Sequence, residues 1–499
     1  MLFRSEVNIV PIKYSDGLDI TKYIAEQPLI AGFCSYSDNI NQVLKTAKMV
    51  KDAYKDAHIT IGGPQINAYE ETVLHDNPFV DSVISYEGEE TFTELADRLI
   101  KNLCLDGCLG LTYRAVDGSI HKNNLRTPIK DLDLLPYPSR DIHEKVRQKY
   151  LYIVGSRGCL GGCSFCGETY IKTKMKPPYV RLRSAISIVD EIEFLMKKYD
   201  VTAFRFTDAT FEDPGEEGFI RANAIFDEII ERRLNISLHI FTRAELVVKE
   251  PDSYFEKAKN AGVECFYIGV EAGNDEDLII YNKKTRVNVS TAAITKIQSA
   301  GIHVGIGFIC FNPFSTYEKL LNNAEFLYST HLGHVFYLFQ TRLEILPQSS
   351  MRKKILEAGL TDKFDYKSHF YDYRFQNPKI GELFSVIRSA YLIPPIYYMD
   401  TLLGMDRTYV SKMSEGNTKQ KIQTLYKDLD LLCEDYRQKN YELFIACINM
   451  SANDANVKQI QNVVQDAKLE NIYDQYVDIY NKINIRVSKE RILANLKNK

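Results

Sequence analysis

Short apolar runs alternate with amphipathic stretches through the first hundred residues. Residues 29–36 and 58–61 have the character of buried strands, and residues 39–55 between them carry the 3.6-residue period of a helix. A third apolar run at 80–86 precedes a helix expected at 91–102. Strand–helix alternation at this spacing predicts a parallel, doubly wound sheet, in which ligands bind beyond the carboxyl ends of the strands.

Polar and glycine residues stand where each of these strands ends. Ser35 follows the first run, Gly62 and Gly63 follow the second, and Glu87 and Gly88 follow the third. Because the carboxyl ends of parallel strands meet at one edge of a sheet, we expect these five residues to line one site. A tight strand-to-helix turn that binds nothing explains the glycine pair as well.

The next segment, residues 107–148, lacks this alternation. Asp117-Gly118 is a hairpin-turn signal, and the prolines at 136 and 138 exclude a helix around them. We therefore expect a small hairpin followed by an interdomain linker.

Strand–helix alternation then returns for six further units. The expected strands are residues 150–155, 203–208, 236–243, 265–271, 301–310 and 334–342. Six such units favour a partial parallel barrel whose site lies at the carboxyl ends of its strands. After Pro347 the pattern becomes helical, with helices expected at 350–358, 380–392, 419–440 and beyond Val457.

Composition narrows the classes of partner and compartment. With 62 basic and 66 acidic residues in 499, the formal net charge is −4, which gives no electrostatic case for nucleic acid or an anionic membrane. There is no apolar run of about 20 residues and no signal-peptide pattern. Ten cysteines without disulfide-scaffold spacing, in a chain this long, indicate a reducing cytoplasm.

Three of these cysteines, Cys159, Cys163 and Cys166, form a C-x3-C-x2-C loop suited to a soft metal or cluster. Glycines that allow a tight wrap around a ligand surround them, at positions 158, 161, 162 and 167. Structural zinc requires four protein ligands, and a disulfide would leave one cysteine over. A cubane cluster with one open iron fits best, and a zinc loop with a distant fourth ligand is the alternative.

With Phe165 before the last cysteine and Gly167 after it, the loop resembles the cluster loop of the radical S-adenosylmethionine (SAM) superfamily. The resemblance implies a catalytic, oxygen-sensitive [4Fe-4S] cluster held by the three cysteines. It also implies that the open iron chelates SAM. An electron, from a donor such as flavodoxin or ferredoxin, would then cleave SAM to methionine and a 5'-deoxyadenosyl radical.

The same resemblance assigns SAM-binding roles to residues at the strand ends. Glu271 matches the carboxylate that bonds the SAM ribose or its surroundings, and Asp208 matches a position near the methionyl end. Arg243 matches a basic residue suited to the methionine carboxylate. Gly305 and Gly307 match the place where backbone approaches adenine. For Asp208 and Arg243, a helix N-cap and a barrel-rim salt bridge are the structural alternatives.

The order GFCSY…IGGPQ…YEGEETF in the first hundred residues resembles the cobalamin-binding domain of one radical SAM subclass. No D-x-H-x-x-G motif is present to ligate cobalt, as is common in that subclass. The domain is expected to begin at its second strand, residues 6–10. Either the domain is vestigial, or the sequence lacks an N-terminal piece.

The predicted architecture is α/β, with an N-terminal Rossmann-like doubly wound parallel sheet, a partial (β/α)6 radical SAM barrel and a helical C-terminal domain. The expected boundaries are 1–106 for the shortened cobalamin-binding-type domain, 107–148 for hairpin and linker, 149–345 for the barrel and 346–499 for the helical domain. The absence of a C-terminal cysteine set argues against an auxiliary cluster.

The leading functional hypothesis is a cobalamin-dependent C-methyltransferase that acts on a small metabolite or peptide natural product. A first alternative is a cobalamin-independent adenosyl-radical enzyme with a vestigial N-terminal domain, which would catalyse an epimerisation, a rearrangement or an elimination. A second is a non-enzymatic, metal-stabilised binding protein. A tRNA methylthiotransferase is disfavoured, because neither its N-terminal cysteine cluster nor an RNA-binding domain is visible.

Overall fold

The computed structural model describes residues 27–140, 150–175, 177–346, 348–362, 364–390, 403–404, 406–410, 413, 416–467 and 470–497. The strand expected at 6–10 lies outside the described residues. The chain forms two compact units, each built from several segments. The first takes in the chain up to Lys130 with Ser164–Lys176 and Glu344–Tyr373, and the second takes in Asp131–Cys163, Pro177–Leu343 and Arg374–Lys499.

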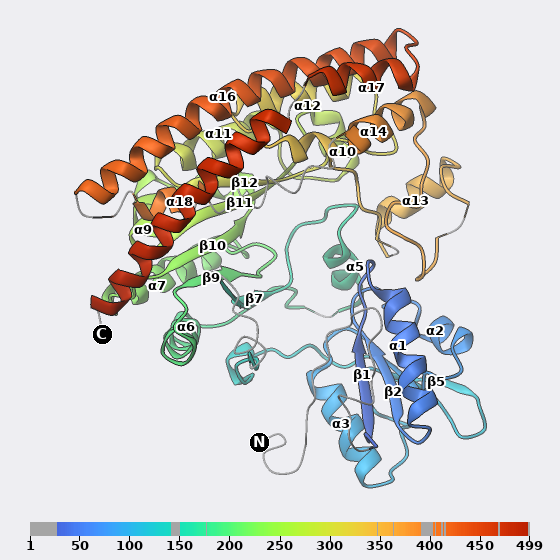
Figure 1. Ribbon diagram of the computed structural model, residues 1–499. Coiled ribbons are helices and arrows are strands. Elements are labelled where there is room, and N and C mark those ends of the chain that lie inside the picture. The colour runs from blue at the N-terminus through green and yellow to red at the C-terminus, as the bar shows by residue number, and fades with distance from the viewer. Residues whose placement is uncertain are drawn as a thin grey trace. The chain divides into compact units, whose positions relative to one another are not determined.

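The first unit is built on a sheet whose described strands number five, in the order β1-β2-β3-β4-β5. These strands are β1 Ile30–Cys34, β2 His58–Gly62, β3 Ser82–Ile84, β4 Leu111–Arg114 and β5 Ile120–Lys122. The first three run parallel and are connected by α1 Ile40–Ala53 and α2 Glu70–Asp76, with α3 Glu89–Ile100 after β3 (Figure 1). This part agrees with the expected alternation, because each apolar run is followed by an amphipathic helix.

The hairpin expected after residue 107 extends this sheet instead of standing apart from it. Strands β4 and β5 pair antiparallel with each other, and β4 pairs antiparallel with β3. The turn between them has Gly118 in the left-handed region, at φ +86. The sheet is therefore mixed, because Leu111 and Tyr113 are buried against Ile84 and the hairpin has to cover that apolar surface.

Two segments from far along the chain belong to the first unit. One carries α5 Gly167–Lys174, and the other carries α13 Ser350–Glu357. In the second segment, Gln348 donates through Nε2 to the carbonyl oxygens of Pro64, Gln65 and Asn67, at 2.8–2.9 Å. Residues 344–373 thus pack on the loop that follows β2, whereas the sequence placed them in the barrel and the helical domain.

The second unit holds a parallel sheet of the order β12-β11-β10-β9-β6 among the described residues. Its strands are β6 Leu151–Ile153, β9 Ala203–Phe206, β10 Ser237–Thr242, β11 Val263–Glu271 and β12 His303–Phe308. The helices between them are α6 Ala185–Tyr199, α7 Glu216–Glu231, α8 Ala244–Val247, α9 Asp252–Asn260, α10 Asp275–Ile280 and α11 Val287–Ser299, and α12 Tyr317–Ser329 follows β12. A two-stranded ladder, β7 Ser156–Arg157 with β8 Arg181–Leu182, flanks the loop that carries the cysteines.

The sixth strand expected at 334–342 is not formed, and that expectation was wrong. Residues Phe336–Gln340 form the 3-10 helix η3, and pairing with the barrel is reduced to one parallel bridge between Phe311 and Arg342. The apolar side chains here do not alternate, because Phe336, Leu338 and Phe339 are all buried. A strand would turn one of the two neighbours Leu338 and Phe339 away from the core.

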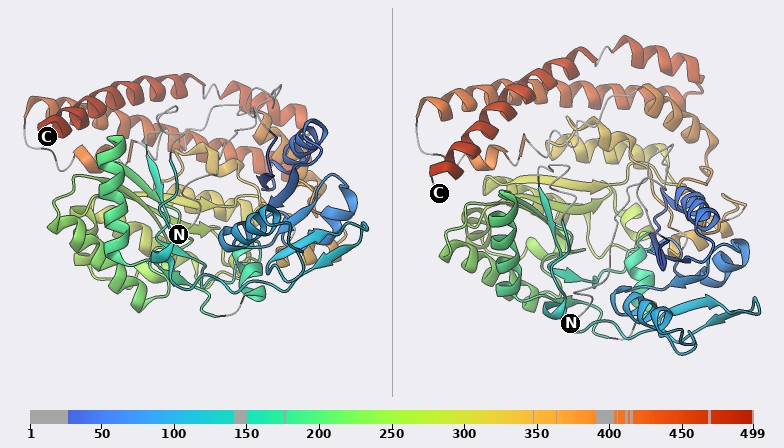
Figure 2. Two further views of the ribbon diagram at one scale, coloured as in Figure 1. Left: turned by 90° about the horizontal axis from the view of Figure 1, so that it is seen from below. Right: turned by 60° about the horizontal axis from the view of Figure 1, so that its bottom comes forward.

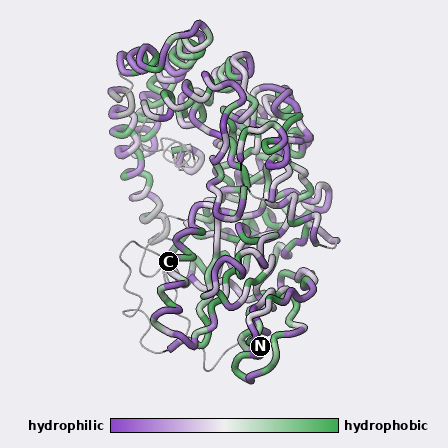
Figure 3. Tube along the Cα trace, turned by 90° about the vertical axis from the view of Figure 1, so that its right-hand side faces the viewer, coloured by the Kyte–Doolittle hydropathy of each residue, from purple (hydrophilic) through white to green (hydrophobic). Residues whose placement is uncertain are grey.

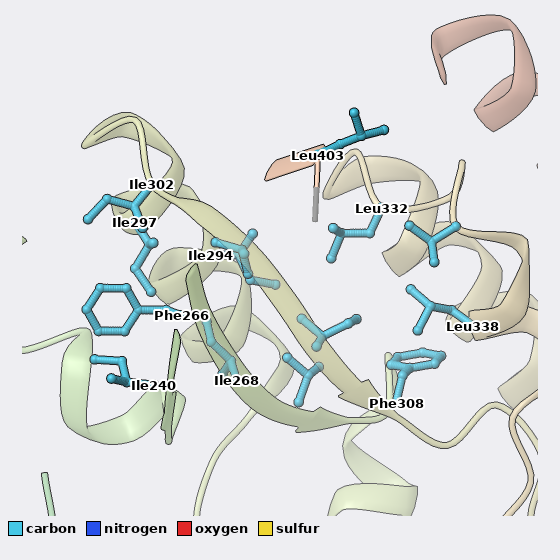
Figure 4. Packing of buried hydrophobic residues seen from close by; sticks show 14 of the residues in the cluster. Ile240, Phe266, Ile268, Ile294, Ile297, Ile302, Phe308, Leu332, Leu338 and Leu403 are labelled. Atoms are coloured by element: carbon cyan, nitrogen blue, oxygen red, sulfur yellow. The ribbon is translucent and has the colours of Figure 1, made fainter. Parts of the chain in front are cut away.

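The core of the second unit lies between the sheet and its helices. Figure 4 shows Ile240, Phe266 and Ile268 of the sheet against Ile294 and Ile297 of α11. Nearer the end of β12, Phe308 packs toward the segment that carries Leu332 and Leu338.

The C-terminal helices of the second unit are α14 Pro378–Ala390, α16 Asn417–Ala452, α17 Val457–Asp466 and α18 Glu470–Lys497, as expected for a helical region. The long α16 packs beside α12 and α18 (Figure 2). Its buried side chains recur at helical spacing, as at Ile422, Tyr426 and Leu429. Hydrophilic and hydrophobic residues alternate along much of the chain (Figure 3). None of the helices in the described part of the chain has both the length and the apolar character that crossing a membrane requires.

Candidate active site

The cysteine loop begins just after β7, the first strand of the two-stranded ladder. Gly158 opens the loop at φ +89, and a Cβ atom there would lie 1.8 Å from the carbonyl oxygen of Tyr179. No other residue type fits this position without moving the backbone. Glycine is therefore a steric requirement at the entry to the loop.

The Sγ atom of Cys159 lies near groups that can donate hydrogen bonds to a metal-bound sulfur. The amide of Gly161 donates to its Sγ atom at 3.1 Å, and the Thr210 hydroxyl lies 3.7 Å away. The amide of Leu160 donates to Asp213 at 2.9 Å and ties down the backbone. Amide donors to a cysteine sulfur are typical of cluster sites, because they stabilise the negative charge of the cluster. Burial raises the pKa of the Cys159 thiol, so cluster assembly must release its proton.

Cys163 belongs to the second unit, whereas Cys166 belongs to the first. Cys166 occupies the N-cap of α5, followed by Gly167, and both residues are partly exposed, as is Phe165. A Cβ atom on Gly167 would come within 3.2 Å of the Leu346 side chain, so this helix start packs closely on the 344–373 segment. Among the described residues, no three His, Cys, Asp or Glu side chains are placed so that they could hold a single metal ion. A cubane cluster does not require such convergence, because it binds each cysteine through a different iron.

Asp208 is buried completely and holds the base of the loop. Its carboxylate accepts from the amide of Gly155 and the hydroxyl of Ser156, both at 2.7 Å, and pairs with Arg221 at 3.3 Å. Arg221 in turn donates to the Gly155 carbonyl at 2.9 Å. Both carboxylate oxygens are occupied by protein donors. These contacts tie Asp208 to the backbone at the base of the loop, and its assignment near the methionyl end of SAM stays a prediction.

Arg243 forms the rim salt bridge that was the alternative to a contact with SAM. Its guanidinium pairs with Asp213 at 2.5 Å and with Glu245 at 3.2 Å. Asp213 also receives the amide of Leu160, so Arg243 supports the cysteine loop through one intermediate residue.

Glu271 ends β11 in a strained conformation beside the loop. Its φ is +70, and the register of β11 with β12 shifts between Gly269 and Glu271. Lys283 lies 3.4 Å from the Glu271 carboxylate, and both side chains are largely buried, with exposed fractions of 5% and 15%. Burial raises the pKa of Glu271, and Lys283 opposes that rise. A non-glycine residue at φ above zero costs energy and often marks a functional position.

The two glycines of β12 are surrounded by side chains of β11. A Cβ atom on Gly305 would meet the Tyr267 ring at 2.8 Å, and one on Gly307 would meet Glu271 Oε2 at 3.4 Å. Gly269 leaves room for the same carboxylate in the same way. The glycines leave space for the side chains of Tyr267 and Glu271, and the approach of adenine to this backbone stays a prediction.

At the carboxyl edge of the first unit's sheet, three of the five expected residues, Ser35, Gly62 and Gly63, pack closely on one another. The Ser35 hydroxyl donates to the Gly62 carbonyl at 2.9 Å and is fully buried. Gly63 has φ +103, and a Cβ atom there would lie 2.5 Å from the Ser35 carbonyl oxygen. Glu87 accepts the amide of Ile129 at 3.0 Å, and Gly88 is the N-cap of α3.

Sequence reasoning missed several residues that support the site. Lys283 and Asn282 come from the end of α10, and Arg221 and Asp213 brace the loop. Their side chains meet the site only through folding, because nothing in the local pattern separates Lys283 from its neighbour Lys284. An acidic pair before a helix, such as Glu212-Asp213, is just as typical of an ordinary helix N-cap as of a residue that supports a site.

The buried carboxyl of Glu212 leads us to expect that the stability of the protein depends on pH. Burial raises the pKa of its carboxyl to about 7, against hydrogen bonds from Thr242 and Tyr254. Because the folded pKa exceeds the unfolded one, this contribution to stability is fully present below pH 4.5 and is lost as the pH rises through about 7. The loss amounts to about 3 kcal/mol. We expect Glu212→Gln to melt above wild type at pH 8 and level with it at pH 4.5.

Thermal melts of both proteins across this range would check the sign. A wild-type curve that rises between these pH values relative to Glu212→Gln would contradict it. Thr242→Val serves as a control, because it removes a donor without removing the titrating group.

A cysteine loop at the carboxyl edge of a parallel sheet, in a chain that also contains a second α/β unit, is typical of an α/β protein that binds a metal cluster. Residues 153–327 match the model of the Radical SAM superfamily, and residues 4–96 match the B12 binding domain. The chain therefore carries a radical SAM domain preceded by a B12-binding domain. The expected cofactors, a [4Fe-4S] cluster, SAM and cobalamin, are confirmed as those of the two domain families.

Curated relatives match this chain at low identity. An uncharacterized methyltransferase of Pyrococcus horikoshii is 26% identical over 328 residues, which covers 63% of this chain and 69% of that protein. The anaerobic magnesium-protoporphyrin IX monomethyl ester cyclase of Rubrivivax gelatinosus is 28% identical over 308 residues, covering 59% of this chain and 53% of that protein. The chain thus spans little more than half the length of the second relative.

Solved structures show the same fold. The cobalamin-dependent SAM radical enzyme OxsB, with aqua-cobalamin bound, superposes with a TM-score of 0.65 at 19% identity, covering 96% of this chain and 74% of that one. The radical SAM methyltransferase TsrM from Kitasatospora setae, with tryptophan substrate and a SAM analog bound, gives a TM-score of 0.55 at 17% identity. It covers 69% of this chain and 68% of that one.

Proposed function

We propose that the enzyme transfers a methyl group to a carbon atom of a small metabolite or peptide natural product. The observation that carries the proposal is the presence of both domain matches on one chain, B12-binding before radical SAM. The names of a relative and of a structural neighbour, both methyltransferases, support methyl transfer, and tryptophan in that neighbour supports a small substrate. When bound, SAM at the cluster supplies a 5'-deoxyadenosyl radical and cobalamin supplies the methyl group.

The site residues of the radical SAM domain divide into ligands and positioning groups. Cys159, Cys163 and Cys166 hold the cluster, and Glu271 bonds the ribose side of SAM from the end of β11. Asp208 and Arg243 keep the loop in place through the contacts described above. In the first unit, Ser35, Gly62, Gly63, Glu87 and Gly88 line the edge on which the corrin rests.

An electron donor of the flavodoxin or ferredoxin type completes the reaction, because SAM cleavage consumes one electron. We place the enzyme in the cytoplasm, since none of the described cysteines forms a disulfide and a reducing compartment preserves both thiols and cluster.

Cobalamin content per cluster, in protein expressed without oxygen and with cobalamin supplied, tests the proposal. We expect a ratio near one. We also expect Gly63→Ala to lower that ratio about tenfold, equivalent to 1.4 kcal/mol, while leaving the iron content unchanged. The physical reason is that its Cβ atom would collide with the Ser35 backbone and deform the carboxyl edge.

Gly118→Ala is the matched control. Gly118 also has positive φ, at +86, but nothing lies within 4 Å of the added Cβ atom and the turn is far from the edge. A wild-type protein with a full cluster and no cobalamin would contradict methyl transfer. It would favour the cobalamin-independent adenosyl-radical alternative.

A further inference from the structure

The end of α10 is fastened to the cysteine loop. The helix starts at an N-cap, Asn274, whose side chain accepts the amide of Asp277 at 2.8 Å. It ends where Asn282 adopts the left-handed conformation, with φ +54, and the amide of Lys283 donates back to Leu278 at 2.9 Å. Asparagine is one of the few residues that accept this conformation readily.

Asn282 makes the direct link. Its Nδ2 atom donates to the carbonyl oxygen of Gly162 at 2.6 Å, and Gly162 is bonded to Cys163. The absence of a side chain on Gly162 allows this approach, since a Cβ atom there would lie 3.2 Å from the same nitrogen. The helix end and the loop are therefore held in register at the residue before a cluster ligand.

This register brings the next residue, Lys283, into the interior. The side chain of Lys283 is only 5% exposed and its ammonium lies 3.4 Å from Glu271. A Cβ atom on Gly269 would come within 3.1 Å of that ammonium, so β11 is built to admit it. Its neighbour Lys284 is exposed. A buried ammonium is expensive unless it compensates negative charge.

We propose that Lys283 tunes the iron–sulfur cluster electrostatically. Its fixed positive charge follows Asn282, which is hydrogen-bonded to the residue before Cys163, and it stabilises the reduced cluster and raises its reduction potential. The proposal rests on the cluster at the three cysteines and is independent of cobalamin and of methyl transfer. The physical basis is that a buried cation lowers the free energy of the more negative, reduced state, and low exposure keeps this interaction from being screened.

A comparison in the Glu271→Gln background isolates this effect from simple ion pairing. Lys283→Met alone would leave a buried carboxylate without its partner and disturb the fold. Glu271→Gln and Glu271→Gln/Lys283→Met differ by the ammonium, and neither keeps that carboxylate. In Glu271→Gln the ammonium has lost its protein carboxylate, so the negative charge that is left for it to compensate is that of the cluster. We expect the double variant to have a reduction potential at least about 59 mV more negative than Glu271→Gln, a tenfold drop in the equilibrium constant for reduction.

The potentials are measured by EPR-monitored redox titration of the reconstituted protein without SAM, after iron and sulfide analysis. Lys284→Met is the matched control and should keep the wild-type potential, whereas Lys283→Arg should stay close to wild type. Equal potentials for Glu271→Gln and the double variant would overturn the proposal and leave Lys283 as the partner of Glu271 only. A shift in Lys284→Met as large as that in the double variant would also overturn it.

Discussion

Cys163→Ala is expected to yield protein with no detectable [4Fe-4S] cluster and no formation of 5'-deoxyadenosine from SAM. With two cysteines left in the loop, only two irons of the cubane have protein ligands, and the open iron that SAM needs is no longer defined. The change is small for the fold, since the side chain is replaced by a smaller one in a partly exposed loop. The loss is therefore chemical rather than structural.

Iron and sulfide analysis, the EPR spectrum of the reduced protein and detection of 5'-deoxyadenosine would measure this loss together. Cys104→Ala is the control, because Cys104 is an exposed cysteine of the first unit and should leave all three readings unchanged. Production of 5'-deoxyadenosine by Cys163→Ala at the wild-type rate would refute the assignment of the loop as the cluster site.

Asp208→Ala is expected to lower the stability of the second unit by about 3–5 kcal/mol and to prevent cluster assembly. The substitution leaves Arg221, whose side chain is 6% exposed, without its carboxylate, and an uncompensated buried charge carries a penalty of this size. It also frees the Gly155 amide and the Ser156 hydroxyl at the start of the strand that leads into the loop.

Thermal melting and iron content separate this role from a direct contact with SAM. Ser156→Ala removes one hydrogen bond to the same carboxylate and should cost only about 1 kcal/mol, with the cluster retained. If Asp208→Ala kept the wild-type melting temperature and a full cluster while SAM affinity fell, Asp208 would act at SAM. Its assignment as the residue that holds the base of the cysteine loop would then be incorrect.

Much of the fold follows from local pattern. Five of the six strands expected in the barrel are present, because buried parallel strands are continuous apolar runs that neighbouring helices then cover. The expected strand at 334–342 failed because a short apolar run is compatible with either period, and burial of Leu338 and Phe339 together decided for a 3-10 helix. Assignment of 344–373 to the first unit also escaped the sequence, since side-chain hydrogen bonds such as those of Gln348 span nearly three hundred positions.

The sequence by itself determined the cysteine spacing and the strands that place the loop and Glu271 at a carboxyl edge. These depend on covalent spacing and local periodicity, which are written directly in the chain. Only the tertiary structure decided the partners of the charges. Asp208 pairs with Arg221, Arg243 with Asp213, and Glu271 with Lys283. The reason is that burying a charge requires a partner, and folding supplies that partner from another element, at a distance that local pattern does not encode.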